Sequence, residues 1–327
     1  MIVPETILAV IPCLDEERHL VRLVMNLLRQ TETLPLRIII VDGGSRDRSR
    51  DIACHLAGQD SRVCLLENPK KLQAAAINLA VATYGADAEY LIRVDAHADY
   101  PDNFCRILVD EACATGADAV VVAMKTEGKQ GFQKAVAAAQ NSKLGNGGSA
   151  HRLVGGEGRW VDHGHHALIR IAAFRAIGGY DESFSHNEDA EFDTRLTIAG
   201  RRIWLTGKTS LVYYPRASPW SLFFQYMKYG QGRARNIFKH RTMPKLRQMA
   251  PALVLPAVLL ALLTPAWSPA ISPLLAWILV CVGYGLKLGH MSGDRRLAMA
   301  GPAAMIMHAG WSLGFWLAAL KHFREGR

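Results

Sequence analysis

Residues 90–97 read Tyr-Leu-Ile-Arg-Val-Asp-Ala-His, a short apolar run that ends on an acidic residue with a histidine two positions later. Such a run is typical of a buried strand, and open α/β sheets bind ligands beyond the carboxyl ends of their strands. Asp95 and His97 therefore stand where they could hold a divalent cation against a nucleotide diphosphate. The same residues could equally form a turn that Asp95 caps, with His97 a simple loop residue.

The first 125 residues alternate short apolar runs with helix-like segments, which predicts βα units around a mostly parallel sheet. We expect strands at 7–11, 37–41, 63–67, 91–94 and 119–124, with helices at 15–29, 47–56, 71–83 and 101–115. Further helices are expected at 131–144, 174–178 and 189–199. The Gly- and Ser-rich residues 145–158 interrupt this pattern.

Charge is distributed unevenly along the chain, which has 327 residues and a net charge of +9. No acidic residue occurs between Asp193 and Asp294, and seven basic residues fall between Lys228 and Arg247. Because an almost uncharged stretch follows from Met249, these basic residues resemble the cytoplasmic flank of a membrane segment more than a nucleic-acid site. Six scattered cysteines without a CxxC pair favour a reducing compartment for the first half.

Three apolar segments come next, at 250–267, 271–289 and 298–320, each near the roughly 20 residues that cross a bilayer. Tryptophans near their ends could act as interfacial anchors. Several prolines leave buried soluble helices, interfacial helices and re-entrant helices open as alternatives. We therefore expect a catalytic domain at 1–240 and a membrane-associated helical region of two or three apolar segments at 241–327.

The positions of basic residues conflict with three crossings. Arg295 and Arg296 suit the cytoplasmic side, yet a third crossing would place Lys321, Arg324 and Arg327 outside, against the positive-inside tendency. Either the third segment does not cross the membrane, or the C-terminal tail departs from this rule.

Two further polar clusters come after expected strands, Pro12–Glu17 after the first and Asp42–Asp47 after the second. A carboxylate such as Glu16 could accept hydrogen bonds from a base or ribose, and the glycines after Asp42 let the backbone approach a ligand closely. Each cluster also has a structural explanation. Acidic residues are favoured at a helix start, and Asp-Gly-Gly-Ser forms a turn with a helix cap.

The fourth cluster, Asn187–Asp189, opens an expected helix. Its carboxylates could simply cap that helix, but their position after a group of histidines makes Asp189 a candidate general base. The histidines are His163, His165 and His166. They could also form a zinc site, although no cysteine or second acidic pair accompanies them.

These clusters, in this order, resemble the motifs of the family 2 inverting glycosyltransferases, over about residues 5–240. The motifs are Val10–Glu17, Ile40–Asp47, Val94–His97 and Asn187–Asp189. Within the family the chain is most similar to the bacterial exopolysaccharide branch of the succinoglycan-biosynthesis type. The segments that carry this closer likeness are Arg93–His97, Gly147–Ala150, Val161–Asp162 and Tyr229–Arg235.

The resemblance implies a GT-A-type α/β fold, a mixed and mostly parallel sheet flanked by helices, and it implies a role for each matching residue. Pro12, Glu16 and Asp42 would hold the uridine and its ribose, Asp95 would bind the diphosphate through Mn²⁺ or Mg²⁺, and Asp189 would be the catalytic base. His97 takes the last place of the family's Asp-x-Asp motif and is inferred as the second metal ligand. The candidates for contacts with the acceptor or the diphosphate are Glu188, Arg195, His163, His165 and Arg233.

Two departures from the family pattern stand out. Asp15 occurs where many members have Asn, and the Gln-x-x-Arg-Trp motif of processive synthases is not present, which puts processive synthesis in doubt.

The expected activity is transfer of one sugar, glucose above all, from a UDP-sugar to a polyprenyl-diphosphate-linked acceptor at the inner membrane, with the catalytic domain in the cytoplasm. The first alternative is synthesis of a polyprenyl-phosphate monosaccharide, whose phosphate acceptor needs little deprotonation. The second is a non-catalytic membrane scaffold. A nucleotidyltransferase would carry a Gly-rich basic loop after the first strand, where Pro12–Glu17 has neither feature.

Overall fold

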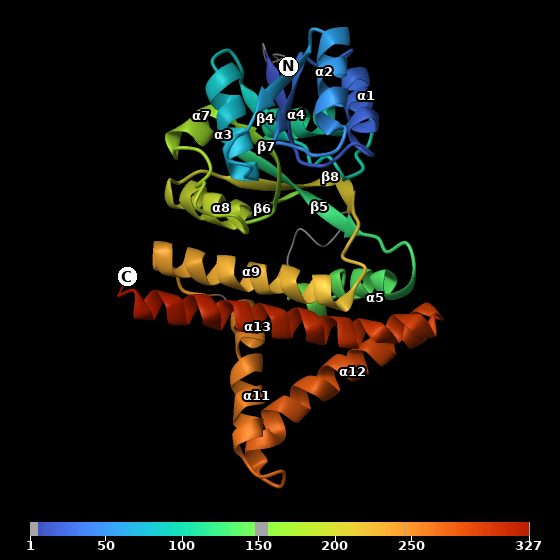
Figure 1. The fold of residues 1–327 in the computed structure, drawn as a ribbon, viewed down its shortest axis with the longest axis vertical. Helices are drawn as coiled ribbons and strands as arrows, with labels where there is room; N and C mark the ends of the chain where they lie inside the picture. The colour runs from blue at the N-terminus through green and yellow to red at the C-terminus, as the bar shows by residue number, and fades with distance from the viewer. Residues whose placement is uncertain (1–5, 148–155, 245, 327) are drawn as a thin grey trace. The chain divides into compact units, whose positions relative to one another are not determined.

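The computed structural model describes residues 6–147, 156–244 and 246–326, which form two compact units (Figure 1). The sheet unit comprises Met1–Met124 and Val154–Val212, and the helical unit comprises Lys125–Leu153 and Tyr213–Arg327. Residues 125–147 and 213–240 thus group with the C-terminal helices, and a catalytic domain at 1–240 stays a prediction. Residues 148–150 of the predicted Gly147–Ala150 loop lie outside the described residues.

In the described residues, eight strands form one sheet in the order β3-β2-β1-β4-β7-β5-β8-β6. Strands β3, β2, β1 and β4 are parallel, whereas β7 runs antiparallel to both β4 and β5. The strands are β1 (Ile7–Cys13), β2 (Leu36–Asp42), β3 (Val63–Glu67), β4 (Tyr90–Arg93), β5 (Ala119–Thr126), β6 (Arg159–Val161), β7 (His165–Arg170) and β8 (Ile203–Tyr213).

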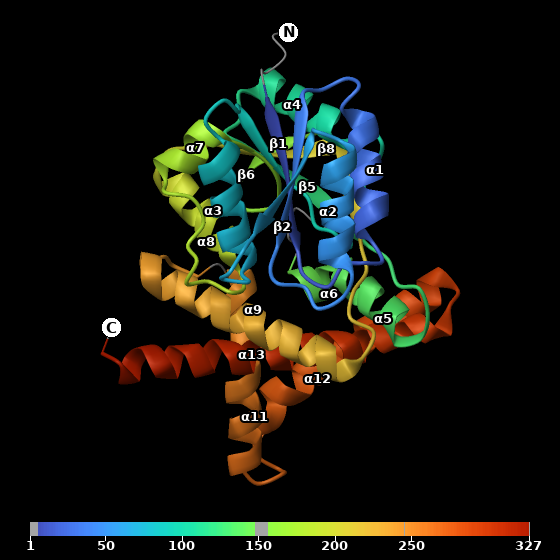
Figure 2. The same ribbon diagram turned by 45° about the horizontal axis from the view of Figure 1, so that its top comes forward.

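Helices cover both faces of the parallel half of the sheet. Figure 2 shows α3 on one side of β1 and β2, with α1 and α2 on the other. Because both faces are covered, β1 is buried and reads as a nearly continuous apolar run. The helices of this unit are α1 (Leu20–Gln30), α2 (Ser49–Gln59), α3 (Gln73–Tyr84), α4 (Phe104–Thr115), α7 (Ile171–Ala176) and α8 (Glu188–Ile198).

The strands and helices predicted for the first 125 residues are confirmed, with shifted ends. The largest shift is at α1, which begins at Leu20. The residues before it form a turn that is bonded to the segment after β2. The backbone N–H of Glu16, for example, donates to Oγ of Ser49, the first residue of α2, at 2.7 Å. The sheet departs from a simple βα series at β7, which lies between β4 and β5. Strands β6, β7 and β8 were not predicted.

The helical unit consists, in the described residues, of α5 (Gly131–Gln140), α6 (Lys143–Asn146), α9 (Pro219–His240), α10 (Leu246–Ala252), α11 (Val254–Leu263), α12 (Ser272–Ser292) and α13 (Ala300–Arg324). Its core joins α5, α9 and α13 through Val136, Ala139, Leu222, Ala300, Ala303, Ala304 and Met307. The helix expected at 131–144 is split, and helix α9 was not predicted.

The apolar segments predicted in the sequence are helical, but only two of the described helices are long and apolar enough to cross a membrane by length and composition. These include short 3₁₀ turns and run over Pro269–Ser292 and Arg295–Arg324. The first predicted segment is divided between α10 and α11, with Pro251 inside α10.

Candidate active site

The pairing of β4 with β7 brings the chemistry-bearing residues of the sheet unit together. Ile92 pairs with Leu168 in antiparallel register, so the residues just beyond β4 lie beside the first residues of β7. Asp95 Oδ2 is accordingly 3.5 Å from His165 Nε2. Helix α8 contributes the remaining acidic residues: Asn187 takes a left-handed conformation, φ 66°, that Asn tolerates better than most residues, and Glu188 and Asp189 come directly after it.

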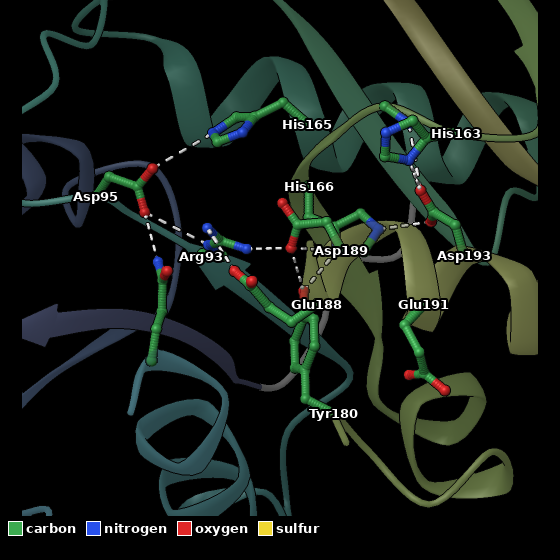
Figure 3. Close-up of polar contacts among 12 residues, drawn as sticks. Arg93, Asp95, His163, His165, His166, Tyr180, Glu188, Asp189, Glu191 and Asp193 are labelled. Carbon is green, nitrogen blue, oxygen red and sulfur yellow. Dashed lines mark hydrogen bonds and ion pairs between the residues drawn. The ribbon is translucent and has the colours of Figure 1, made fainter. Parts of the chain in front are cut away.

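Arg93 lies at the centre of this group (Figure 3). Its guanidinium forms an ion pair with Oδ1 of Asp189, lies 3.4 Å from Asp95 Oδ1 and lies 3.8 Å from Glu188 Oε1. The Arg93 side chain is only 5% exposed. Burial lowers the pKa of Arg93, but the surrounding carboxylates outweigh that effect and hold it well above its ordinary value. One buried cation thus links the end of β4 to the start of α8.

Asp95 is held in a defined position beyond β4. Its Oδ1 accepts a hydrogen bond from Gln73 Nε2 at 2.9 Å, and its backbone N–H donates to the hydroxyl of Tyr100 at 2.8 Å. Burial raises the pKa of Asp95, but Arg93 and His165 together lower it by a larger amount. The pKa is therefore below its ordinary value, and the carboxylate stays ionised. Asp95 is therefore a fixed negative charge at the carboxyl edge of the sheet.

The contacts of Asp189 all reach one of its two oxygens. In the described structure Oδ1 is contacted by Arg93, by the hydroxyl of Tyr180 at 3.5 Å and by His166 Nδ1 at 3.4 Å (Figure 3). Burial raises the pKa of Asp189, but Arg93 and His166 together hold it well below its ordinary value. Asp189 is thus an oriented, ionised carboxylate, and the hydrogen bonds that it accepts from the described residues go to Oδ1.

A buried chain of polar groups supports Asp189 from behind. His166 Nε2 lies 2.6 Å from Asp193 Oδ1, and Asp193 Oδ2 lies 2.7 Å from His163 Nδ1. Burial lowers the pKa of His166, but Asp193 outweighs it and raises the pKa well above the ordinary value. A protonated His166 donates from both ring nitrogens, to Asp193 and to the Tyr180 hydroxyl, which is 2.5 Å away.

Glu188 differs from its neighbour Asp189. Burial, reinforced by the negative charge of Asp189, raises the pKa of Glu188 to about 7. The two adjacent carboxyl groups are therefore in different protonation states near neutral pH, with Glu188 partly neutral and Asp189 ionised.

This raised pKa predicts a pH-dependent effect of Glu188→Gln on stability. In the unfolded chain Glu188 titrates near its ordinary value of 4.5, so the stability that this group provides at acidic pH is lost as the pH rises through about 7. We expect Glu188→Gln to raise the melting temperature more at pH 8 than at pH 5. Thermal unfolding of the detergent-solubilised protein measures this, and an equal change at both pH values would contradict it.

The loops after β1 and β2 are joined by reciprocal hydrogen bonds. Asp15 Oδ1 accepts from the backbone N–H of Arg46 at 2.7 Å, and the backbone N–H of Asp15 donates to Ser45 Oγ at 3.0 Å. Asp15 has a φ of 57°, a left-handed conformation that Asn and Asp both tolerate. Asp42 accepts from Ser45 Oγ at 2.6 Å and thereby closes its own turn.

Glu16, in the loop after β1, and His97, in the loop after β4, are in contact. His97 Nδ1 lies 2.9 Å from Glu16 Oε1, and the His97 side chain is 58% exposed. Pro12 is opposite Val41 in the parallel register of β1 and β2, so the predicted donor-binding residues share one edge of the sheet. His97 contacts Glu16 there, whereas the carboxylate of Asp95 contacts Gln73, Arg93 and His165.

The remaining candidates have different surroundings. Arg195 is bound within its own helix to Glu191, at 2.7 Å, and donates to the carbonyl of Ile177, contacts that favour a structural role. Arg233 is on α9 of the helical unit. His163 belongs to the chain of polar groups behind Asp189, through its contact with Asp193.

The arrangement fits a divalent cation by charge. Among the described residues, no group of three or more His, Cys, Asp or Glu side chains has the geometry of a metal site, zinc included. However, the carboxylates of Asp95, Glu188 and Asp189 outnumber the single arginine between them. Mg²⁺ typically binds one or two carboxylates and completes its shell with substrate phosphates and water, so a site with few protein ligands is compatible with this cation.

Sequence reasoning missed three residues that organise this site: Arg93, His166 as a partner of Asp189, and Asp193. A signal was present for Arg93, because an arginine inside an apolar strand must have buried partners. No comparable signal existed for Asp193, which lies on a helix among other acidic residues and whose partners, His163, Gly164 and His166, are about 30 residues away in the sequence.

The chain is similar in sequence to known proteins. The family model "Glycosyl transferase family 2" matches residues 8–178. Succinoglycan biosynthesis protein ExoA of Rhizobium meliloti (strain 1021) is 56% identical over 318 residues, which cover 97% of this chain and 96% of that protein. Glycosyltransferase GlyG of Streptococcus pneumoniae serotype 4 (strain ATCC BAA-334 / TIGR4) is 33% identical over 118 residues, 36% of this chain and 38% of that protein.

Among solved structures, the mannosyltransferase PcManGT from Pyrobaculum calidifontis in complex with GDP-Man and Mn²⁺ matches with a TM-score of 0.62. The match covers 98% of this chain and 88% of that chain at 17% sequence identity. At this identity the likeness shows a shared fold, and the GT-A-type fold expected from the sequence is confirmed.

Proposed function

This chain belongs to glycosyltransferase family 2, and we propose that it transfers one sugar from a UDP-sugar, UDP-glucose in the first instance, to a lipid-linked acceptor in exopolysaccharide synthesis. The relative that is 56% identical takes part in succinoglycan biosynthesis by its name, and that match runs through the helical unit as well as the sheet unit. A polyprenyl-diphosphate-linked sugar is the acceptor class that suits a transferase next to a membrane.

The observation that carries this proposal is the orientation of Asp189. A general base needs an ionised group with an oxygen free to take the proton. Arg93, Tyr180 and His166 all contact Oδ1, which leaves Oδ2 to face an acceptor hydroxyl. The site thus has a base fixed in one orientation, as a single-displacement reaction requires.

The proposed reaction is a direct displacement at the anomeric carbon. Asp189 Oδ2 takes the proton from the acceptor hydroxyl as the hydroxyl oxygen forms its bond to that carbon. The bond to the diphosphate breaks on the opposite face, so the anomeric configuration inverts. Arg93 and protonated His166 keep Asp189 ionised before the proton arrives. Pro12, Glu16 and Asp42 are proposed to hold the uridine and ribose.

A divalent cation, Mn²⁺ or Mg²⁺, would stabilise the negative charge that develops on the departing diphosphate. We assign Asp95 as its protein ligand because this carboxylate is ionised and fixed at the carboxyl edge of the sheet. His97 is proposed as the second ligand through Nε2, and its Nδ1 would keep the contact with Glu16, since a metal-binding histidine usually donates its other ring N–H to a carboxylate, a carbonyl or water.

Removal of the Asp95 carboxylate is predicted to abolish metal-dependent turnover. We expect Asp95→Ala to lower the rate of transfer by about 10²–10³-fold, the usual effect of losing one group that stabilises charge in a transition state. The measurement is UDP release at increasing Mn²⁺ concentration. Metal-dependent turnover that matches the wild type would contradict the assignment.

A donor screen tests the proposed function as a whole. Purified protein would be incubated with UDP- and GDP-sugars, polyprenyl-linked acceptors and Mg²⁺ or Mn²⁺, and nucleoside diphosphate release measured. We expect release from a UDP-sugar only when a lipid-linked sugar acceptor is present. Transfer to polyprenyl phosphate alone would favour the monosaccharide synthase, and release of pyrophosphate would contradict glycosyl transfer.

We also propose a location at the inner membrane, with the sheet unit in the cytoplasm. The support is the pair of long apolar helices in the helical unit and the basic residues that precede them in the sequence. This placement brings nucleotide sugars and lipid-linked acceptors to the same side.

A further inference from the structure

The hairpin formed by α11 and α12 is apolar on its surface as well as in its sequence. Residues 248–286 include no charged side chain. Large apolar side chains are exposed on both helices and on the connection between them, namely Leu259, Leu260, Leu262, Leu263, Trp267, Leu275, Leu279, Val280 and Leu286. An exposed apolar surface of this extent, next to a basic segment, is suited to a lipid bilayer. The inference about how this hairpin meets the membrane rests on the membrane association proposed for the chain.

Both legs of this hairpin are attached to one helix, α13. On the first leg, the backbone N–H of Leu255 donates to Ser312 Oγ at 2.9 Å, and Trp316 Nε1 donates to the carbonyl of Ala252 at 2.8 Å. On the second leg, a Cβ atom at Gly285 would lie 2.4 Å from the Ala298 carbonyl oxygen, just before α13. The two legs thus return to α13 at points that lie along its length.

Helix α13 in turn packs along α9, as both ribbon views show (Figures 1 and 2). Glycines allow the two backbones to touch: a Cβ at Gly310 would lie 2.4 Å from the carbonyl oxygen of Phe223. Further along the same pair, the rings of Phe238 and His322 stack with their centroids 4.4 Å apart. The contact extends over much of α13, so the two helices must lie at the same depth relative to the membrane.

Helix α9 does not suit the hydrocarbon core of a bilayer. It carries four basic residues and no acidic residue in its 22 positions, the basic ones being Lys228, Arg233, Arg235 and Lys239. Each such residue is strongly unfavourable at the centre of a membrane. A basic helix with aromatic side chains is instead typical of the membrane surface.

We propose that α13, although long and apolar, lies at the membrane surface beside α9, and that only the α11–α12 hairpin enters the bilayer. Helix α11 has ten residues and extends about 15 Å, half of the roughly 30 Å hydrocarbon core. The ends of the hairpin lie on one face of the membrane. This arrangement places Arg295, Arg296, Lys321 and Arg324 on the same side, which removes the conflict with the positive-inside tendency.

Cysteine labelling in the full chain tests this topology. Native Cys54 and Cys113 are exposed on the sheet unit and report its face of the membrane. Two further variants carry Cys54→Ser, Cys64→Ser and Cys113→Ser together with either Arg295→Cys or Gly326→Cys. The probe is a membrane-impermeant maleimide, applied to sealed spheroplasts and to inverted vesicles.

We expect the cysteines at 295 and 326 to be labelled from the same face as Cys54 and Cys113, at least tenfold more than from the other face. Labelling of positions 295 and 326 from different faces would show that α13 crosses, and labelling of both positions from the opposite face would show that α12 crosses alone. Either result overturns the inference.

Extraction of the same membranes with alkaline carbonate separates this inference from the proposed location. Release of the wild-type protein into the soluble fraction would overturn the proposed membrane insertion and the hairpin with it. Retention in the membrane, with either cysteine on the opposite face, would overturn the hairpin topology alone.

Discussion

Asp189→Asn is expected to lower kcat for sugar transfer by about 10³-fold, within the range that general bases contribute, while the affinity for the UDP-sugar is retained. The amide can accept the contacts of Arg93 and Tyr180 at one oxygen, but it cannot take a proton from the acceptor. Initial rates of UDP release, together with donor binding by calorimetry, separate the two effects.

The matched control for this experiment is Asp110→Asn, which alters an exposed carboxylate paired with Arg106 on α4 and should leave kcat unchanged. Near-wild-type turnover of Asp189→Asn would contradict its assignment as the base. It would instead favour the polyprenyl-phosphate alternative, in which the acceptor is already ionised.

Arg93→Met is expected to lower the free energy of unfolding by about 3–5 kcal/mol, the usual effect of removing one partner from a buried ion pair. The change leaves Asp95, Glu188 and Asp189 close together without their central cation. For a chain of this size the melting temperature should fall by about 10 °C. Arg93→Lys should recover only part of this loss, because one ammonium group cannot contact several carboxylates at once as the planar guanidinium group does.

The effect of Arg93→Met should also depend on pH. Arg93 lowers the pKa of Asp95 and of Asp189, so its stabilisation is present above their unfolded pKa of about 3.9 and is lost as the pH falls through their folded values. Thermal unfolding should therefore show a smaller difference between wild type and variant at pH 3 than at pH 7.5. A difference under about 1 kcal/mol at pH 7.5 would contradict the role of Arg93 as the central charge.

How much of the fold could be predicted depended on burial. Strands β1, β2 and β4 are buried over most of their length, so their sequences are nearly continuous apolar runs that stand out. Strand β7 begins with two histidines that belong to the site, and the apolar residues of β8 are interrupted by the polar run Thr206–Ser210. Helix α9 was not predicted because its basic residues suggested only a flank of the membrane segments.

The site could be predicted only in part, because several of its contacts join residues that are far apart in the sequence. Asp95 and Asp189 occupy motif positions, and the structure joins them through Arg93. The register of β7 against β4, which brings His165 to Asp95, depends on long-range pairing that a single sequence does not reveal. The contact between Glu16 and His97 likewise depends on two loops that are 81 residues apart.

The stereochemistry of the product decides whether the oriented Asp189 supports direct displacement. Purified protein would transfer glucose from UDP-α-glucose to a polyprenyl-diphosphate-linked sugar, and the proton coupling of the new anomeric centre would be measured by NMR. We expect a β-linked product, since one displacement inverts the configuration. An α-linked product would show that the reaction retains the configuration, and would contradict direct displacement with Asp189 as the base.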